Sequence, residues 1–196
     1  MSIIVGVIPL LGYVCGSMTF SIWVTSWVKG VDVRDAGSGH ASATNTIRQA
    51  GWLPGALVAF LDISKGFLPT YLAVRAGLPN WGIGLTAGFA VIGHCWPLFA
   101  GFRGGMGLAT LAGGLLATSP LSMLIGLGLL ISLVLILHHS ARGSAITGLL
   151  LAPLLWFIGF RGPEFWVGSI GGVVIFFRFL SDWSRKYREL WLDRET

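Results

Sequence analysis

Three segments carry most of the groups suited to polar chemistry in an otherwise apolar chain. They are VDVRDAGSGHASATNTIRQAG (31–51), GHCWPLFAGFRGGMGLAT (93–110) and HHSARGSAITG (138–148). Glycine lets backbone N–H groups approach a ligand closely, and successive N–H groups form a site for an anion. Arginine adds recognition of phosphate through two parallel hydrogen bonds. The combination predicts a phosphate-binding pocket.

Each of these signals also has a plain structural interpretation when it stands alone. The Gly-Ser-Gly run at 37–39 suits a flexible turn. Thr44 and Asn45 suit the cap of a helix that holds Arg48. The Gly-Gly-Met-Gly run at 104–107 resembles part of a phosphate loop, but it lacks the Gly-Lys-Ser/Thr ending, and glycine is common in membrane helices.

Asp62 and Lys65 lie inside the apolar stretch 52–75, three residues apart and therefore on one face of a helix. An isolated charge in such a segment is costly, so intramembrane charges are candidates for function. One interpretation is a mutual ion pair that satisfies only itself. The other is that Lys65 lines a cavity and faces an anion while Asp62 orients it.

The histidines are weak signals individually. His94 follows Gly93 near the end of an apolar span, where a hydrogen-bonded core residue fits as well as a catalyst. His138 and His139, beside Arg142, resemble half of a metal site, but no carboxylate or thiolate nearby in sequence completes it. They fit better as markers of a loop at the interface. Neither a metal nor an organic cofactor is indicated.

The elements that must position these groups are membrane helices. Hydrophobic residues make up 54% of the chain and charged residues 11%, with a mean hydropathy of +0.78, whereas a soluble domain has about 25% charged residues. A spanning helix needs about 20 apolar residues. The 196 residues therefore leave room for roughly seven spans and for no separate soluble domain. We expect no nucleic-acid partner, and the sequence does not determine the oligomeric state.

We expect an all-α integral membrane protein, a single polytopic domain over residues 1–196 with about seven transmembrane helices and polar, glycine-rich cytoplasmic loops. Breaks at glycine, proline and polar clusters predict spans near 4–28, 52–75, 82–100, 107–118, 120–138, 144–160 and 164–180. The fourth is short for a full crossing. The tail at 181–196, SDWSRKYRELWLDRET, is amphipathic and predicts a helix on the membrane surface.

Basic residues are distributed asymmetrically between the predicted loops. With the N-terminus outside the cell, the outer side receives only Arg75 and Arg161. The other side receives Lys29, Arg34, Arg48, Arg103, Arg142, Arg178, Arg185, Lys186, Arg188 and Arg194. Because cytoplasmic loops carry the excess of Lys and Arg, we expect the C-terminus and the polar segments to be cytoplasmic.

Taken together, the polar stretches resemble the signatures of the bacterial acyl-phosphate:glycerol-3-phosphate acyltransferases, the PlsY family. That family's first signature is approximately GSGNxGATNxxR, followed by a DxxKG span and then GHxxPxxxGFKGGKGxAT. The matching stretches here are GSGHASATNTIR (37–48), DISKG (62–66) and GHCWPLFAGFRGGMGLAT (93–110), in the same order and with the same spacing. The resemblance covers essentially the whole chain.

The resemblance implies an enzyme of the bacterial plasma membrane that moves a fatty acyl group from acyl phosphate to the 1-hydroxyl of glycerol 3-phosphate. The products are lysophosphatidic acid, for phospholipid synthesis, and phosphate. Acyl phosphate is an activated donor, so no covalent enzyme intermediate is needed. The protein must hold two phosphates and stabilise the charge that develops. Substrate phosphate itself can take the proton, since the sequence shows neither paired catalytic carboxylates nor a Ser/His/Asp order.

The resemblance also gives roles to individual residues. The residues expected to be catalytic are Ser38, Lys65 and His94. Those expected to bind substrate or phosphate are Gly37, Gly39, His40, Thr44, Asn45, Arg48, Arg103, Gly104, Gly105 and Arg178. The stretch 37–48 is then a substrate-binding loop that dips toward the bilayer.

Several positions depart from the family pattern. His40 stands where the family usually has Asn, Ser42 where it has Gly, and Met106 where it has the second Lys of GFKGGKG. Near the C-terminus, FRFLSDW replaces an RHxxN-like stretch, with Phe179 at the histidine and Asp182 at the asparagine. The loss of a cation at 106 and the added carboxylate at 182 are each expected to weaken binding of a dianion by about a kcal/mol. A protonated His40 would compensate.

Two further functions therefore stay open. One is a divergent family member acting on another phosphorylated or less anionic lipid substrate. The other is a lipid- or anion-binding membrane protein that kept the fold without catalysis. A transporter is disfavoured, because the charged residues gather on one side and do not line a path across the membrane.

Overall fold

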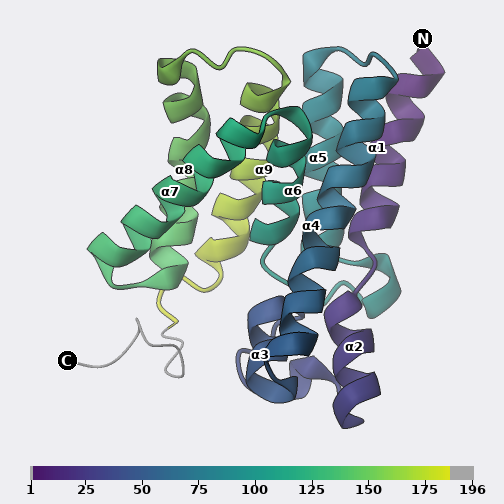
Figure 1. The fold of residues 1–196 in the computed structure, drawn as a ribbon, viewed down its shortest axis with the longest axis vertical. Helices are drawn as coiled ribbons and strands as arrows, with labels where there is room; N and C mark the ends of the chain where they lie inside the picture. Colours follow the sequence, from purple (N-terminus) through teal and green to yellow (C-terminus); the bar gives the residue numbers. More distant parts are fainter. Residues whose placement is uncertain (1, 186–196) are drawn as a thin grey trace.

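The structure, a computed structural model, describes residues 2–185, and within this range the chain forms helices without any strand (Figure 1). The helices are α1 (Ser2–Gly16), α2 (Phe20–Lys29), α3 (Ala43–Ala50), α4 (Trp52–Arg75), α5 (Asn80–Cys95), α6 (Leu108–Thr118), α7 (Pro120–Leu137), α8 (Ser140–Ile158) and α9 (Pro163–Leu180), with 3-10 turns η1 (Val33–Asp35) and η2 (Leu98–Ala100). The expected all-α class is confirmed.

The long helices form a bundle in which neighbouring pairs approach closely. The most extensive packing joins α8 with α9, α4 with α6, α1 with α5, and α5 with α9. Gly66 of α4 faces the backbone of Thr110 in α6, and Gly113 of α6 faces the backbone of Ile63 in α4, with no room for a side chain at either glycine. Small residues allow membrane helices to pack at backbone contact in this way.

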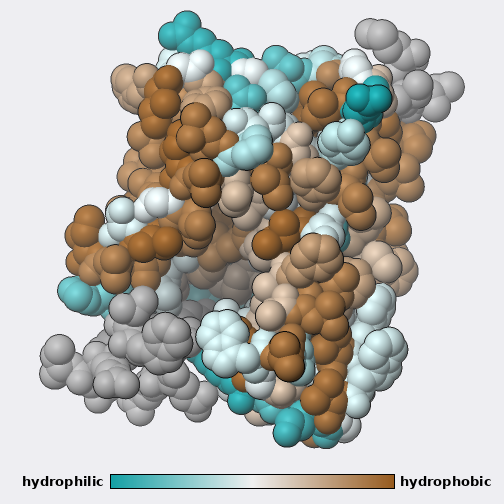
Figure 2. Space-filling view, viewed as in Figure 1, coloured by the Kyte–Doolittle hydropathy of each residue, from teal (hydrophilic) through white to brown (hydrophobic). Residues whose placement is uncertain are grey.

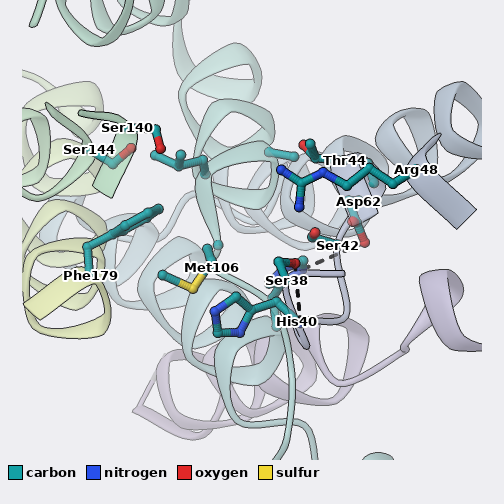
Figure 3. Close-up of a pocket in the computed structure, with 15 residues that line it drawn as sticks. Ser38, His40, Ser42, Thr44, Arg48, Asp62, Met106, Ser140, Ser144 and Phe179 are labelled. Carbon is teal, nitrogen blue, oxygen red and sulfur yellow. Dashed lines mark hydrogen bonds and ion pairs between the residues drawn. The ribbon is translucent and has the colours of Figure 1, made fainter. Parts of the chain in front are cut away.

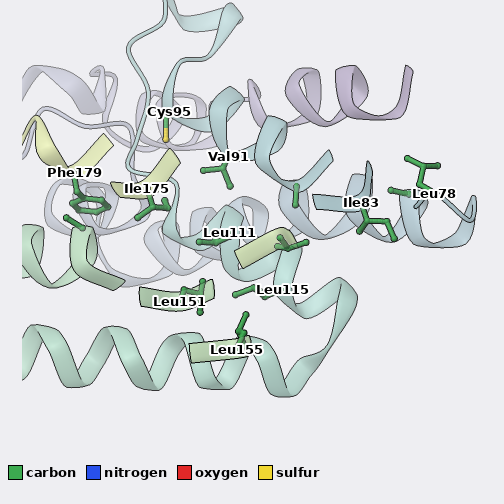
Figure 4. Packing of buried hydrophobic residues seen from close by; sticks show 14 of the residues in the cluster. Leu78, Ile83, Val91, Cys95, Leu111, Leu115, Leu151, Leu155, Ile175 and Phe179 are labelled. Carbon is green, nitrogen blue, oxygen red and sulfur yellow. The ribbon is translucent and has the colours of Figure 1, made fainter. Parts of the chain in front are cut away.

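A buried hydrophobic cluster fixes the central helices against one another (Figure 4). Val91 of α5, Leu111 of α6, Leu151 and Leu155 of α8, and Ile175 of α9 are all buried in it. Because lipid tails are as apolar as these side chains, close van der Waals packing stabilises the contact between the helices, rather than removal from water. The cluster therefore holds α5, α6, α8 and α9 in register, and the ends of these helices carry the polar segments.

The outer surface of the bundle suits contact with lipid. Six described segments are long and apolar enough to cross a membrane, namely Gly6–Lys29, Trp52–Arg75, Asn80–Ala100, Pro120–Leu137, Ser140–Ile158 and Pro163–Leu180, and Leu108–Thr118 is a shorter apolar helix. Figure 2 shows apolar side chains over the flanks of the molecule and hydrophilic ones gathered at its two ends. The prediction of about seven spans corresponds to these six and the short helix.

The first predicted span, 4–28, corresponds to the apolar segment Gly6–Lys29. It is divided at residues 17–19 into α1 and α2. The Ser17 hydroxyl bonds back to the carbonyl of Tyr13 at 2.9 Å, and hydroxyl side chains that bond to nearby backbone compete with helix continuation. The break leaves the carbonyl of Met18 available to another element.

Other boundaries differ for local reasons. The third predicted span, 82–100, ends as an α-helix at Cys95 because Pro97 cannot continue the helical ladder. The sixth, predicted at 144–160, begins at Ser140. His139 is its N-cap, and its Nδ1 accepts from the backbone N–H of Arg142 at 3.4 Å.

The polar segments gather at one end of the bundle. The segment between α2 and α4, which includes α3, the connection between α5 and α6, and the turn between α7 and α8 lie at the end away from the N-terminus (Figure 1). The amphipathic tail predicted at 181–196 starts with a turn at 181–184, and its part from residue 186 onward lies outside the described residues.

Candidate functional site

A pocket lies where the polar segments meet (Figure 3). Its volume is about 230 Å³, below the range of about 300–1,000 Å³ usual for drug-sized ligands. Its lining comes from the first loop, from α3 to α6 and from α8 and α9, and comprises Ser38, His40, Ser42, Ala43, Thr44, Arg48, Asp62, His94, Met106, Gly107, Leu108, Ala109, Ser140, Ser144 and Phe179. The space suits a small polar headgroup, and an acyl chain must extend outside it.

The first wall of the pocket is a tight loop organised by Asn45. Gly37 and Gly39 adopt φ values of 62° and 70°, which glycine reaches without strain. The fully buried Asn45 side chain accepts from the N–H of Ser38 at 3.2 Å and donates to backbone carbonyls of the same loop, the nearest being that of Val33 at 2.7 Å. Asn45 therefore shapes the loop and does not line the pocket, whereas Ser38 does.

Helix α3 presents a cation to the pocket. Its N-cap is Ser42, whose hydroxyl accepts from the N–H of Asn45 at 3.2 Å, so neither Thr44 nor Asn45 is the cap. Thr44 and Arg48 lie one turn apart on the same face and both line the pocket. The buried Nε of Arg48 has no hydrogen-bond partner among the described residues. Buried donors are nearly always paired, so this nitrogen marks a place where an anion would bind.

The opposite wall is the first part of α8. Ser140 and Ser144, one turn apart on this helix, face the pocket from the side opposite Arg48 (Figure 3). The N-terminus of a helix also carries partial positive charge. Sequence reasoning singled out the segment 138–148 for its glycine and hydroxyl content but did not select these two serines.

Asp62, Lys65 and His94 form a buried cluster between α4 and α5, here termed the interhelical cluster. Lys65 Nζ lies 3.0 Å from Asp62 Oδ1 and donates to the carbonyl of Met18 at 2.8 Å, in the break between α1 and α2. His94 Nδ1 lies 3.6 Å from the same Asp62 oxygen. Asp62 and His94 line the pocket and Lys65 does not.

In this structure Lys65 contacts Asp62 and Met18 and is not among the lining residues, so the expected contact of Lys65 with an anion stays a prediction. The Lys65 ammonium contacts the Asp62 carboxylate and the main-chain carbonyl of Met18. These contacts link α4 to the residues between α1 and α2. The side chain that reaches the pocket is Asp62. Sequence spacing placed the two on one helical face but did not show which of them reached the cavity.

The segment before α6 approaches α5 too closely for side chains. The N–H of Gly105 donates to the carbonyl of His94 at 3.1 Å, and the carbonyl of Gly104 accepts from the N–H of Ala41 at 3.3 Å. A Cβ at either glycine would collide with backbone atoms or with the His94 ring. These glycines thus hold the first and third segments together and place Met106 in the pocket wall.

Arg34 joins the first and third polar segments. Its guanidinium donates to the carbonyls of Ala100 at 2.9 Å and Arg103 at 3.3 Å, and pairs with Asp32 at 2.6 Å. The hydrogen bond from Arg34 lowers the pKa of the Asp32 carboxyl, against an opposing effect of burial. Arg103, expected to bind phosphate, is exposed and outside the pocket lining. Sequence reasoning did not identify the Arg34–Asp32 contact.

His40 contacts the end of α9 through two charged residues. Its Nε2 lies 2.7 Å from Asp182 Oδ2, and its Nδ1 lies 3.4 Å from an Arg178 guanidinium nitrogen. Arg178 also donates from Nε to the carbonyl of Gly105 at 3.0 Å, so it braces Gly104 and Gly105, here termed the glycine segment, rather than lining the pocket. Burial lowers the pKa of His40 despite the nearby carboxylate, which favours a neutral imidazole over the protonated one considered from sequence.

The structure divides the predicted site residues into pocket lining, surrounding framework and exposed surface. The pocket lining brings together Ser38, His40, Thr44, Arg48 and His94. The surrounding framework, outside the lining, contains Gly37, Gly39, Asn45, Lys65, Gly104, Gly105 and Arg178, and Arg103 lies on the exposed surface. Lining residues that had no assigned role in the sequence are Ser140, Ser144, Leu108, Ala109 and Ala43.

The chemistry of the lining is that of an anion site beside an apolar surface. A guanidinium, several hydroxyls, two imidazoles and the Asp62 carboxylate, which is paired with Lys65, occupy the polar side, while Met106, Leu108 and Phe179 occupy the apolar side. Within residues 2–185, no group of three or more His, Cys, Asp or Glu is placed to hold a metal ion. The arrangement can hold a phosphate at one side and the beginning of a hydrocarbon chain at the other.

Comparisons with known proteins all return the same activity name. The family model for glycerol-3-phosphate acyltransferase matches residues 6–189. The glycerol-3-phosphate acyltransferase of Aquifex aeolicus (strain VF5) is 36% identical over 175 residues, covering 86% of this chain and 88% of that protein. The corresponding protein of Myxococcus xanthus (strain DK1622) is 41% identical over 143 residues, covering 71% and 73%.

Solved structures extend this likeness to three dimensions. A crystal structure of an integral membrane glycerol 3-phosphate acyltransferase, PlsY, in its glycerol 3-phosphate form has a TM-score of 0.81 and 32% identity, covering 92% of this chain and 90% of that one. The lysophosphatidic acid form of the enzyme has a TM-score of 0.80 and 31% identity, with the same coverage. The likeness thus extends over nearly the whole length of both chains.

Proposed function

The chain belongs to the glycerol-3-phosphate acyltransferase family, and we propose that it transfers a fatty acyl group from acyl phosphate to the 1-hydroxyl of glycerol 3-phosphate. The products are lysophosphatidic acid and inorganic phosphate, and the reaction serves phospholipid synthesis. The observation that carries the proposal is the Arg48 guanidinium in the pocket lining, whose Nε has no partner among the described residues. A substrate phosphate supplies that partner.

The pocket residues have separate roles in binding the two substrates. Arg48 and Thr44 hold one phosphate from α3, and Ser140 and Ser144 offer hydroxyls from α8 across the pocket. Two phosphates must be held, one on the donor and one on the acceptor. The two polar walls provide one site for each, and holding both reactants together supplies much of the rate enhancement.

The chemical step needs no covalent enzyme intermediate. The 1-hydroxyl oxygen of glycerol 3-phosphate attacks the carbonyl carbon of acyl phosphate, forming the ester C–O bond as the bond between that carbon and the phosphate oxygen breaks. The hydroxyl proton passes to the departing phosphate, which leaves as inorganic phosphate. Ser38 and His94 lie on the pocket wall where polar groups stabilise the charge that develops on the carbonyl oxygen.

The apolar side of the pocket suits the donor's hydrocarbon chain. Leu108 and Ala109 begin α6 and Phe179 lies near the end of α9, so apolar side chains border the pocket beside its polar walls. The acyl chain then lies among apolar helices while its phosphate stays at the polar end. This position keeps the reactive carbonyl at the boundary between the two.

We further propose that the protein lies in a bacterial plasma membrane with its N-terminus outside and its pocket cytoplasmic. Lys29, Arg34 and Arg142 belong to the pocket end of the bundle, whereas Arg75 and Arg161 lie at the turns of the opposite end. An excess of Lys and Arg marks the cytoplasmic side of a membrane protein.

A second candidate rests on one position in the pocket wall. Met106 lines the pocket where the PlsY signature carries a lysine, so the site has one cation fewer than the signature supplies. This favours an acceptor less anionic than glycerol 3-phosphate, such as a neutral or singly charged alcohol.

The experiment that tests the proposal is phosphate release by the purified protein from palmitoyl phosphate, with glycerol 3-phosphate present or absent, and with the lipid product identified by mass spectrometry. We expect acceptor-dependent release and lysophosphatidic acid. The Arg48→Ala variant should lose this release, and the Lys29→Ala variant, which removes an exposed cation at the end of α2, should keep it.

Three outcomes separate the candidates. Lysophosphatidic acid formed by the wild type supports glycerol 3-phosphate as acceptor. Product formed only with glycerol or another less charged alcohol selects the divergent acceptor. Absence of product with every acceptor, from protein that still binds phosphate, contradicts catalysis and supports an anion-binding role.

A further inference from the structure

His40 and Asp182 stand 142 positions apart in sequence and contact each other in the structure. Both replace residues of the PlsY family pattern, which has asparagine at each of these two positions. The His40 Nε2 to Asp182 Oδ2 distance is 2.7 Å, and the two side chains are 11% and 7% exposed. Two departures that look independent in sequence therefore form one buried pair.

The hydrogen-bond chemistry fixes the imidazole in one tautomer. An ionised carboxylate only accepts hydrogen bonds and a guanidinium only donates them. Nε2 of His40 therefore carries the proton toward Asp182, and Nδ1 is the acceptor that faces an Arg178 nitrogen at 3.4 Å. A neutral imidazole thus bridges the Asp182 carboxylate and the Arg178 guanidinium. Arg185, 3.8 Å from Asp182, is the other described charge beside the pair.

The position of the ring relative to the pocket gives the pair a function. His40 lines the pocket, and Asp182 does not. Figure 3 shows the His40 ring beside Met106 and Ser38 at the pocket wall. The imidazole therefore separates the Asp182 carboxylate from the space that would hold a phosphate. Without the ring, the Asp182 carboxylate would border that space, where its nearest described cation is the exposed Arg185 and Met106 adds none.

We propose that His40 is a specificity-determining residue that shields the Asp182 carboxylate from an anionic substrate and, through its Nδ1, helps to hold Arg178 against the glycine segment. The link to the glycine segment is the hydrogen bond from Arg178 Nε to the carbonyl of Gly105, at 3.0 Å. The choice of a phosphate as substrate rests on the proposed function. The coupling between His40 and Asp182 rests only on the geometry.

The test is a double-mutant cycle on His40→Ala and Asp182→Asn, with KM for glycerol 3-phosphate and kcat measured separately. His40→Ala alone uncovers the carboxylate, and we expect KM to rise about tenfold with a smaller change in kcat. Asp182→Asn alone should change KM by less than about threefold. The double variant should have a KM several times lower than that of His40→Ala, because its uncovered group is neutral.

The matched controls separate shielding from loss of structure. Asp35→Asn removes an exposed carboxylate from the same loop, outside the pocket, and should leave KM unchanged. His40→Asn restores a group that can donate to Asp182 and accept from Arg178, and should lie closer to the wild type than His40→Ala. Thermal unfolding in detergent shows which variants are folded.

The outcomes decide between a coupled pair and two independent residues. A KM for the double variant equal to or higher than that of His40→Ala, in folded protein, overturns the shielding role. So does an unchanged KM in folded His40→Ala. If His40→Ala does not fold, comparison of His40→Asn with the His40→Asn/Asp182→Asn variant carries the same test: shielding requires the second substitution to lower KM or leave it unchanged.

If the protein lacks the proposed acyltransferase activity, the same variants can still be compared by their binding of phosphate. Binding of inorganic phosphate is then measured as the increase in unfolding temperature that phosphate causes in each variant. The shielding role predicts the same order, with His40→Ala binding most weakly and the double variant recovering. A wild type without turnover but with this order contradicts the proposed function alone, whereas turnover without this order contradicts the shielding alone.

Discussion

The interhelical cluster and the α3 wall each hold a cation near the pocket, but the two cations are in opposite states. Lys65 is engaged by Asp62 at 3.0 Å and by the carbonyl of Met18 at 2.8 Å. Arg48 lines the pocket, and its buried Nε has no partner among the described residues. A charged residue in a membrane segment is a candidate for function. The comparison shows that the partners of the charge decide whether it stabilises the fold or is available to bind a ligand.

The strongest test of this difference is Lys65→Met. Removing one partner of a buried ion pair leaves Asp62 uncompensated, and we expect destabilisation by about 3–5 kcal/mol. The measurement is thermal and denaturant unfolding in detergent, with Lys29→Met as a control for loss of an exposed lysine. Unchanged stability with a large rise in KM would instead place Lys65 in contact with the ligand.

Next in expected size is Arg48→Ala. Because the guanidinium is available to a phosphate, kcat/KM should fall about 100-fold. Thermal stability should change little, since the described structure gives the Nε no partner to lose. Steady-state phosphate release and an unfolding curve on the same preparation check both halves. A loss of stability that matched the loss of activity would remove the contrast with Lys65.

A smaller effect is expected from Met106→Lys, which adds a cation to the pocket wall. The KM for glycerol 3-phosphate should decrease about fivefold, because the added charge faces the space assigned to a phosphate. Met106→Leu controls for the change of side-chain shape. An unchanged or higher KM in the folded lysine variant would mean that position 106 does not contact the acceptor phosphate.

The smallest expected effect is a change of stability with pH that is caused by His40, in the loop before α3. Burial lowers the pKa of His40 below its usual value of 6.5, so in acid the unfolded chain takes up a proton that the folded chain does not. The contribution to the free energy of unfolding therefore decreases as the pH falls below 6.5 and levels off below the folded-state pKa.

This pH effect is measured as the difference in unfolding midpoint between wild type and His40→Asn over about pH 5 to 8. The difference cancels most contributions of other groups, leaving those that face His40, namely Asp182, Arg178 and Arg185. A wild type that gained stability relative to the variant in acid would show that the Asp182 carboxylate, rather than burial, controls the imidazole.

Much of the fold could be predicted from the sequence, because the bilayer allows few backbone structures. In lipid every backbone group must be satisfied within the segment, so apolar runs of sufficient length become helices. The segment 52–75 was predicted with the bounds that α4 has, and 120–138 differs from α7 by one residue. The break at residues 17–19 was missed because its polar groups are few and their main tertiary partner, Lys65, is distant in sequence.

The candidate site was only partly readable for a different reason. Ser38, Thr44 and Arg48 were predicted and line the pocket, since they lie close together on one loop and one helix. Ser140 and Ser144 were missed, because hydroxyl residues near a helix start are common and nothing local distinguishes them. Their role depends on α8 facing α3 across the pocket, which is a property of the bundle (Figure 3).

The sequence by itself determined that this is a helical membrane protein with its polar groups gathered in three segments, because hydropathy and glycine content act locally along the chain. Only the tertiary structure decided which of those groups share a pocket. Ion pairs and hydrogen bonds between distant elements depend on ångström-scale distances. The contact of His40 with Asp182 and the engagement of Lys65 by Met18 follow from helix packing that spacing along the chain does not specify.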